Sequence, residues 1–404
     1  MKKYRFNLSA AIITSIALLI SCTENTIPYD LSDSGLNIDT LTVRLIDGGT
    51  YLAPPLMGST NGLYFGESDG FKNLFSLIQL SSLSLSGAVW TTNLLDSTVT
   101  VDSLVFTFTA TDSISPTASQ FELYYFPEGG DSVFSETESN YLNFNEANVT
   151  SAVKIGPIST FSQGIPDSIN PKLSFKFTDT ENILNFIADT SGTENRTFML
   201  RNVDPIDNII SINSRESIDY PTLKVYYRVG VDTLQSVYFP LKDMTIVEPR
   251  PITYIDKENI SVGRAAGLKS IIKFDFNDFP IDSTVMVIKS AELIFNSVPG
   301  ISLDYFEIKA AILEDSIGIS KYWEITEDLY TIEPDILLTG TFDGNQMKME
   351  IRSFLQGVNT GSYNNFGLKL YGSSTSDQFK SANLILDQNN SANNPYLRII
   401  YVKL

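Results

Sequence analysis

The chain has no histidine and a single cysteine, Cys22, in 404 residues. The absence of histidine removes the commonest general base, proton shuttle and metal ligand. A lone cysteine forms no disulfide within the chain, so stability must come from buried apolar surface. We therefore predict a non-catalytic protein that carries no cofactor. A pair of carboxylates of the glycosidase kind is defined by distance in space and stays open as an alternative.

Basic residues are also scarce, with 28 Lys and Arg against 47 Asp and Glu. The net charge is −19, and it becomes −22 without residues 1–21, which hold three basic and no acidic residues. A chain this acidic, with no basic block, repels the phosphate backbone. The same charge opposes adsorption on anionic lipid head groups. Nucleic acid is thereby excluded as a partner.

Long apolar runs are missing, apart from a short one at the N-terminus. Lys2, Lys3 and Arg5 precede an apolar stretch over residues 8–20, and the small residue Ser21 follows it. This order is typical of a secretory signal peptide. The run is too short for a membrane-spanning helix of about 20 apolar residues. We predict that residues 1–21 form a signal peptide.

The segment Leu19-Ile20-Ser21-Cys22 resembles the lipobox of bacterial lipoproteins. The resemblance implies that Cys22 becomes the lipidated N-terminus, and that two or more acyl chains anchor it stably. Thr23 follows, where an aspartate is associated with retention in the inner membrane. We therefore expect a lipoprotein anchored in the outer membrane, with a surface-facing and a periplasm-facing orientation both open. Residues 22–38 are mostly polar and predict a tether between lipid and fold.

Short alternating runs recur throughout the rest of the chain. Leu173, Phe175 and Phe177 alternate with polar residues, as expected for half-buried strands, and residues 306–310 do the same. Helical periodicity is almost absent, and the best helix candidate, residues 181–187, covers about two turns. The strand at residues 173–177 matches residues 347–351, and the short apolar segment that follows each of them predicts a turn of helix. The sequence predicts an all-β fold.

The two halves of the chain contain the same features in the same order. Each half has a glycine-flanked turn, then a strand that begins with Ser-Thr-Val, and finally a closing strand of the pattern Pro-x-Leu-x-[Val/Ile]-x-Tyr. The pairs include residues 66–75 with 263–272, 97–99 with 283–285, 221–227 with 395–401, and the openings 39–41 with 232–234. We predict a duplication with its boundary near Gly230, giving two tandem antiparallel β-sandwich (jelly-roll-like) domains at 39–230 and 231–404.

This order of turns and strands resembles the DNRLRE-type domains, which are jelly-roll modules related to carbohydrate-binding modules. Ser214-Arg215-Glu216 is similar to the Ser-Arg-Glu that precedes the family's last strand, whereas the second half has Asp387-Gln388-Asn389. The resemblance implies carbohydrate binding or surface scaffolding rather than catalysis. A fainter resemblance, through residues 101–104, is to surface lipoproteins of Gram-negative bacteria.

The only two tryptophans, Trp90 and Trp323, are candidate platforms for stacking a sugar ring, with Tyr322 or Tyr330 beside Trp323. The competing interpretation is a tryptophan partly buried at a sheet edge.

Acidic loops are a second candidate feature. Asp131, Glu136 and Glu138 fall in one loop, while Asp30 and Asp33 lie in the tether, just before Asp39. Neither spacing matches the Asp-x-Asp-x-Asp-Gly arrangement of a calcium loop, so solvated acidic loops are favoured and no metal ligand is assigned. A structural calcium remains an alternative, because such a site need not be contiguous in sequence.

Basic side chains occupy matching positions in the two halves, namely Lys72 with Lys269 and Arg201 with Lys369. They are candidates for meeting a polyanionic sugar, although outward-facing strand positions explain them equally well.

Together these observations predict a lipid-anchored cell-surface binding protein for glycan or adhesion. The alternative is a structural or assembly lipoprotein of an outer-membrane complex with no sugar ligand. In both cases the partners are the membrane, through Cys22, and a polysaccharide or an outer-membrane protein.

Overall fold

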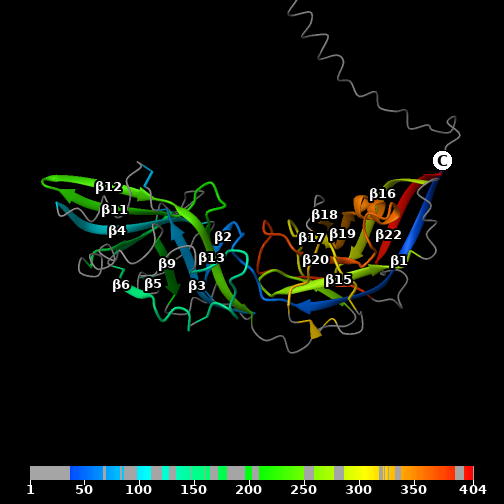
Figure 1. Cartoon of the computed structure of the whole chain (residues 1–404), viewed down its shortest axis with the longest axis horizontal. Helices are drawn as coiled ribbons and strands as arrows, with labels where there is room; N and C mark the ends of the chain where they lie inside the picture. Colours follow the sequence, from blue (N-terminus) through cyan, green and yellow to red (C-terminus); the bar gives the residue numbers. More distant parts are fainter. Residues whose placement is uncertain are drawn as a thin grey trace, which may run out of the picture.

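The structure is a computed structural model of the chain. It describes residues 37–66, 70–81, 84–85, 98–110, 121–126, 133–145, 147–158, 160–163, 172–179, 196–202, 209–249, 259–276, 286–317, 322, 324–325, 327–332, 338–386 and 395–403. Nearly all regular structure in these residues is antiparallel β-strand, which confirms the predicted all-β fold. Figure 1 shows two groups of strands side by side along the long axis.

The first group, called the N-group here, contains two five-stranded sheets. One has the order β12 (Asp232–Tyr238), β11 (Thr222–Val229), β4 (Val99–Thr109), β8 (Lys172–Phe177) and β7 (Thr160–Gln163). The other has the order β13 (Pro240–Pro249), β3 (Phe71–Leu80), β9 (Arg196–Asn202), β5 (Phe121–Tyr125) and β6 (Val153–Pro157). A small sheet joins β2 (Gly62–Phe65) to β10 (Ile210–Asn213). Apolar side chains of the two large sheets share one core, so this group is sandwich-like.

The second group, the C-group, contains one eight-stranded sheet whose two ends meet. Its order is β1 (Asn37–Leu52), β15 (Leu268–Phe274), β20 (Leu368–Gly372), β17 (Glu307–Ile312), β18 (Leu338–Asp343), β19 (Gln346–Glu350), β16 (Met286–Asn296) and β22 (Tyr396–Lys403). The sheet closes because β1 pairs with both β15 and β22. A small sheet of β14 (Asn259–Val262) and β21 (Ala382–Ile385) lies against it.

The pairing order is similar in the two groups, except that β18 pairs with both β17 and β19, whereas β5 pairs with β6 and β8 pairs with β7. The strands matched by sequence have matching neighbours: β4 pairs with β8 and β11, as β16 pairs with β19 and β22. One difference concerns continuity. Pro240 begins β13 and has no N–H to donate, so the strand breaks after β12 and its two parts join different sheets. The corresponding β1 passes the same corner with only a register shift between Leu45 and Asp47, so it links both sides of its sheet.

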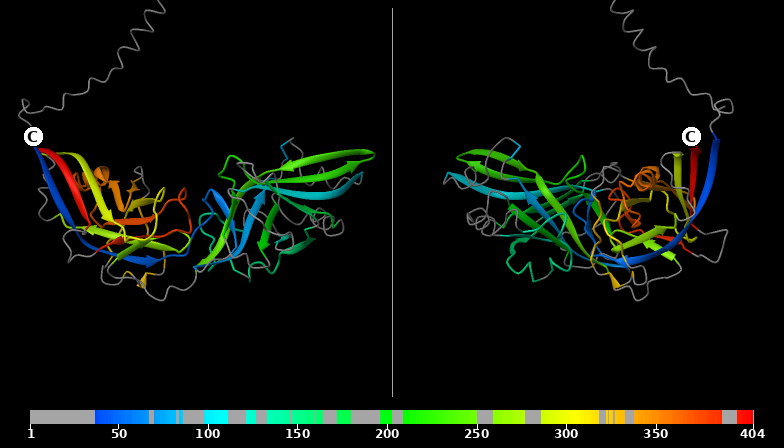
Figure 2. Two further views of the ribbon diagram at one scale, coloured as in Figure 1. Left: turned by 180° about the vertical axis from the view of Figure 1, so that it is seen from behind. Right: turned by 45° about the vertical axis from the view of Figure 1, so that its right-hand side comes forward.

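The sheets divide the chain differently from the predicted bounds of 39–230 and 231–404. β1 lies in the C-group, between β15 and β22, whereas β12 and β13 lie in the N-group. Figure 2 shows β1 running along the C-group beside the last strand of the chain. The predicted boundary at Gly230 is instead a tight turn, since Val229 and Asp232 are paired and Gly230 has φ +63°. A two-residue hairpin loop with glycine at positive φ is a favoured connection, so β12 pairs with the strand before it.

Alternation places the predicted apolar positions in the core. Leu173, Phe175 and Phe177 of β8 are buried, while Lys172 and Lys176 are exposed. The helical segment expected after Ile351 is present as α4 (Arg352–Asn359), whose Phe354 and Leu355 are buried in the C-group core. The other helix candidate, residues 181–187, lies outside the described residues.

Aromatic rings hold the two groups together. Phe379, between β20 and β21, makes edge-on contacts with Tyr64 at 4.9 Å and with Phe71 at 5.1 Å between ring centroids. Met57, Val247, Ala265 and Ala266 complete an apolar cluster with Phe71. This small core fixes the walls of the cleft described next.

Candidate functional site

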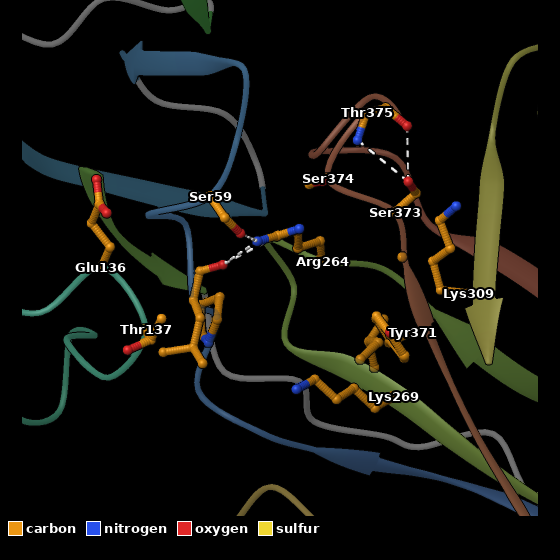
Figure 3. Close-up of a pocket in the computed structure, with 14 residues that line it drawn as sticks. Ser59, Glu136, Thr137, Arg264, Lys269, Lys309, Tyr371, Ser373, Ser374 and Thr375 are labelled. Carbon is orange, nitrogen blue, oxygen red and sulfur yellow. Dashed lines mark hydrogen bonds between the residues drawn. The ribbon is translucent and has the colours of Figure 1, made fainter. Parts of the chain in front are cut away.

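A cleft of about 530 Å³ lies at the junction of the two groups. Its walls come from the connector 53–61, from the N-group loop at Glu136 and Thr137, and from β15, β17 and the end of β20 in the C-group. Figure 3 shows three cationic side chains on these walls: Arg264, Lys269 and Lys309. Its volume falls in the range of small-molecule sites, roughly 300–1,000 Å³.

Arg264 is positioned by the turn between β14 and β15. Gly267 closes this turn with φ +66°, and its carbonyl accepts a hydrogen bond from the Ala53 N–H at 2.9 Å. The Arg264 guanidinium donates to the Leu56 carbonyl at 3.0 Å and to Ser59 Oγ at 2.8 Å. Within the described residues no carboxylate lies within 4 Å of it. Burial lowers the pKa of Arg264, so its positive charge is only partly solvated.

Lys269 and Lys369 share one carboxylate, that of Asp328. The Lys269 ammonium lies 2.5 Å from it and the Lys369 ammonium 3.3 Å, and the Tyr51 hydroxyl donates to it at 3.0 Å. Burial would raise the pKa of Asp328, but the two ammonium groups and these hydrogen bonds hold it below its usual value. Burial also lowers the pKa of Lys269, although the nearby Asp328 carboxylate acts to raise it.

Lys309 and a run of hydroxyls form the far wall. The Lys309 ammonium donates to Thr339 Oγ1 at 2.9 Å and lies 3.7 Å from the Glu307 carboxylate. Ser373, Ser374 and Thr375 follow β20 and line the cleft together with Tyr371. Figure 3 shows Tyr371 between the side chains of Lys269 and Lys309.

The cleft carries an excess of positive charge. Three cations line its C-group wall, namely Arg264, Lys269 and Lys309. Lys369 does not line the cleft but shares Asp328 with Lys269, and Glu307 is the carboxylate beside Lys309. On the facing wall, Glu136 is itself 3.6 Å from the guanidinium of Arg215. Because partly buried charges are costly without a counter-charge, this arrangement is suited to an anionic group.

The sequence-predicted aromatic platform is wrong at Tyr322. This residue is only 4% exposed and belongs to a cluster with Tyr51, Ile271 and Leu313. Its ring covers Gly49, where a Cβ would lie 2.0 Å from the ring. A buried ring has no face free for a sugar. Tyr330 is 81% exposed but does not line the cleft.

Trp90, Trp323 and the lipidation residue Cys22 lie outside the described residues. The acidic residues Asp30, Asp33 and Asp131 lie outside them as well. The part of the chain that the structure describes contains no group of three or more Cys, Asp or Glu arranged to hold a metal ion. Asp39 accepts a hydrogen bond from the Tyr401 hydroxyl at 3.1 Å.

The acidic loop and the Ser-Arg-Glu segment meet at a buried carboxylate, Asp243. Its N–H donates to Glu136 at 2.7 Å, and its own carboxylate accepts the Arg215 N–H at 2.8 Å. Ser214 Oγ donates to the Thr60 carbonyl at 2.6 Å. Burial raises the pKa of Asp243 well above its usual value, and the carboxylates of Glu216 and Glu136 raise it further. The hydrogen bond from the Arg215 N–H lowers this pKa but does not offset the effect of burial. These contacts tie the loop and segment to β13.

Sequence matching treated Lys269 and Lys369 as separate positions, whereas they converge on Asp328. Their counterparts behave differently: Lys72 lies 3.9 Å from Glu248 with both side chains well exposed, and Arg201 pairs with Glu122 across β5 and β9.

Sequence reasoning missed Arg264. The sequence does contain a feature that distinguishes this residue. The matching position in the other glycine-flanked turn holds Glu67, so the charge at this position is opposite in the two halves.

Residues 66–70 also have the Gly-x-Ser-x-Gly spacing of a nucleophile elbow. That motif requires a strand-to-helix turn, but here the segment joins strands β2 and β3. Its serine, Ser68, lies outside the described residues.

A scan against protein-family models, a search of curated proteins and a search of solved structures each found no match to this chain. In the described residues no helix has the length and apolarity to cross a membrane.

Proposed function

We propose that this chain is a non-catalytic, lipid-anchored surface protein that binds an acidic glycan in the junction cleft. The observation that carries the proposal is the uncompensated positive charge around Arg264 on a chain of net charge −19. Long-range repulsion from the rest of the surface selects against most polyanions, so the attraction must be local. A carboxylate or sulfate on a sugar supplies the missing counter-charge.

The lining of the cleft supports a sugar as the carrier of this charge. The hydroxyls of Ser373 and Thr375 match the donor and acceptor groups of a saccharide, and the Tyr371 ring offers a flat apolar face. Arginine suits carboxylate and sulfate groups because its planar fork donates two parallel hydrogen bonds.

Lipid anchoring at Cys22 and placement in the outer membrane rest on the sequence. The first described residue, Asn37, pairs with Lys403 at the end of β22. In Figures 1 and 2 this end lies opposite the hairpin of β11 and β12 along the long axis. An anchor before residue 37 would thus leave the junction cleft and the hairpin away from the membrane.

The alternative is a structural lipoprotein of an outer-membrane complex, and the same hairpin favours it. Val231 at the turn is 96% exposed, and Val229 and Leu234 beside it are also exposed. An apolar tip at the far end of an elongated molecule is suited to contact with another protein.

The test is binding by the full-length protein, purified in detergent micelles. The probes are hyaluronan and polygalacturonate as acidic glycans and dextran as a neutral one, measured by isothermal titration calorimetry. We expect binding to an acidic glycan only. Arg264→Gln should weaken it about tenfold or more, because a hydrogen bond to a charged group contributes about 1.5–3 kcal/mol.

Arg228→Gln is the matched control, since Arg228 forms an exposed ion pair with Asp102 on the distal hairpin. It should leave binding unchanged. Lys309→Met removes a second charge of the cleft and should also weaken binding. Failure of the wild-type protein to bind either acidic glycan, together with co-purification of an outer-membrane protein, would replace the proposal with the assembly role.

A further inference from the structure

Tyr305 is exposed in an unusual backbone conformation. Its side chain is 97% exposed, and its φ is +61°. Among the described residues it is the one non-glycine residue with positive φ. Bulky residues rarely adopt this region, because their Cβ crowds the backbone there.

The surrounding turn holds this conformation in place. The Phe306 N–H donates to the Leu303 carbonyl at 2.9 Å, so Asp304 and Tyr305 are the central residues of a four-residue turn. Ser302 Oγ donates to the Asp304 carboxylate at 2.7 Å, while Leu303 and Phe306 are buried on either side. Glycine or asparagine is favoured at the third position of such a turn. A tyrosine there presents its ring to solvent from a rigid support.

Next to this ring is a hollow of about 640 Å³, which adjoins the junction cleft. Tyr305, Phe342 and the carboxylate residues Asp304 and Glu307 line it, and Thr375 lines both the hollow and the cleft. Thr375 Oγ1 donates to the Glu307 carboxylate at 3.1 Å, and Glu307 is the partner of Lys309. The cationic cleft therefore continues into a hollow with aromatic walls and acceptor groups.

We propose that Tyr305 and Phe342 form a second subsite, which stacks a pyranose ring of the same glycan. This inference rests on the proposed function, because the glycan reaches the subsite from the cleft. The apolar face of a sugar ring packs on an aromatic face, and its hydroxyls donate to carboxylates. Asp304 and Glu307 repel a second anionic group, so the ring at this subsite is an uncharged one. The preferred ligand then has acidic and neutral sugars in one chain.

Hyaluronan fits this description, since glucuronate alternates with N-acetylglucosamine. We would titrate the full-length protein in detergent micelles with its disaccharide and its decasaccharide. Tyr305→Ala should weaken decasaccharide binding about three- to tenfold, the size of an aromatic stacking contact, and leave disaccharide binding unchanged. Tyr305→Phe should retain wild-type affinity for both.

Tyr330→Ala is the matched control, because Tyr330 is also highly exposed but lines neither the cleft nor the hollow. It should bind both oligosaccharides as the wild type does. Tyr305→Gly suits the positive φ and keeps the experiment valid if the alanine variant misfolds.

The outcomes separate the two proposals. Equal decasaccharide affinity of Tyr305→Ala and wild type, with Arg264→Gln impaired, would overturn the subsite and keep the cleft. Loss of disaccharide binding in Tyr305→Ala would also overturn the subsite, because Tyr305 would then contribute to binding in the cleft and not at a separate position. No binding of either oligosaccharide by the wild type would overturn the subsite, and it would overturn the cleft as well if polygalacturonate also fails to bind.

Discussion

Replacing Asp328 with asparagine removes the one carboxylate that Lys269 and Lys369 share. The side chains of the two lysines are 18% and 9% exposed, so their charges depend on this partner. The amide keeps the size of the side chain and an acceptor for the Tyr51 hydroxyl. The variant Asp328→Asn should therefore unfold more easily than the wild type.

The expected loss follows from the burial of the network. Removing one partner of a fully buried ion pair costs about 3–5 kcal/mol, whereas an exposed pair contributes about 0–1 kcal/mol. The Asp328 side chain is 35% exposed and its two partners are nearly buried, which places the loss between these limits. We expect about 2 kcal/mol of unfolding free energy, or about 4–8 °C in Tm for a unit of this size.

Ligand affinity should change in the opposite direction. Without Asp328 the cleft gains one unit of positive charge, and a unit-charge contact in a water-like dielectric contributes about 1 kcal/mol. Hyaluronan should thus bind up to about fivefold more tightly to Asp328→Asn. A variant that is less stable yet binds better is hard to explain by general misfolding.

The assays are thermal unfolding followed by circular dichroism and calorimetric titration with hyaluronan. Asp343→Asn is the matched control, because that carboxylate is 86% exposed and lies 3.6 Å from Lys348. It should change Tm by less than about 4 °C, because an exposed pair contributes about 0–1 kcal/mol. The folded-state pKa of Asp328 is lowered, so its contribution exists above the unfolded pKa of about 3.9 and disappears as pH falls through the folded value. A Tm equal to wild type at neutral pH, or weaker hyaluronan binding by the variant, would refute the reasoning.

Two further predictions concern stability. Asp243→Asn should raise the unfolding free energy at pH 7 by about 1 kcal/mol, because it removes the cost of burying an ionisable carboxyl group at a residue that is 1% exposed, and because the amide keeps an acceptor for Arg215. Because burial raises the folded-state pKa of Asp243, wild-type stability should fall as pH rises from about 4 through that value, and urea titrations at several pH values should show a flatter profile for the variant. Gly267→Ala should cost about 2 kcal/mol or more in the same urea assay, since its φ is +66° and the new Cβ would lie 2.2 Å from the Ala53 carbonyl oxygen; Gly344→Ala, with φ +59° and open space at the Cβ, is the control for the backbone conformation alone.

Local patterns were sufficient to predict the strands. In β8 and β17 the apolar residues alternate with polar ones, and the alternate positions are buried as expected. The short helix after Ile351 followed from an apolar segment of the right length. These features depend on neighbours within a few residues, so the sequence is enough to locate them.

Pairing across the chain was beyond sequence reasoning. β1 begins at residue 37 and pairs with β22, which ends at residue 403, while an identical alternation would have allowed it to pair within residues 39–230. Backbone hydrogen bonds have the same chemistry in every strand, so periodicity does not name the partner. The turn at Gly230 belongs to a hairpin for the same reason, although its position in the sequence was correctly marked.

In the candidate site, too, the sequence identified some of the residues, but the fold determined which of them lie together. Sequence matching selected Lys269 and Lys369, but only the fold brings them to one carboxylate beside Arg264. It also selected Tyr322 as an exposed ring, which the fold buries against Gly49.

By itself, the sequence determined that the protein is built of antiparallel strands, that it is strongly acidic and that its order of turns and strands repeats. These properties are written in composition and in contacts between near neighbours. The tertiary structure decided which strands close each sheet, where the two groups meet and which charges share a cleft. The physical reason is distance: Lys269, Asp328 and Lys369 lie far apart along the chain, and their electrostatic interaction depends only on their separation in space.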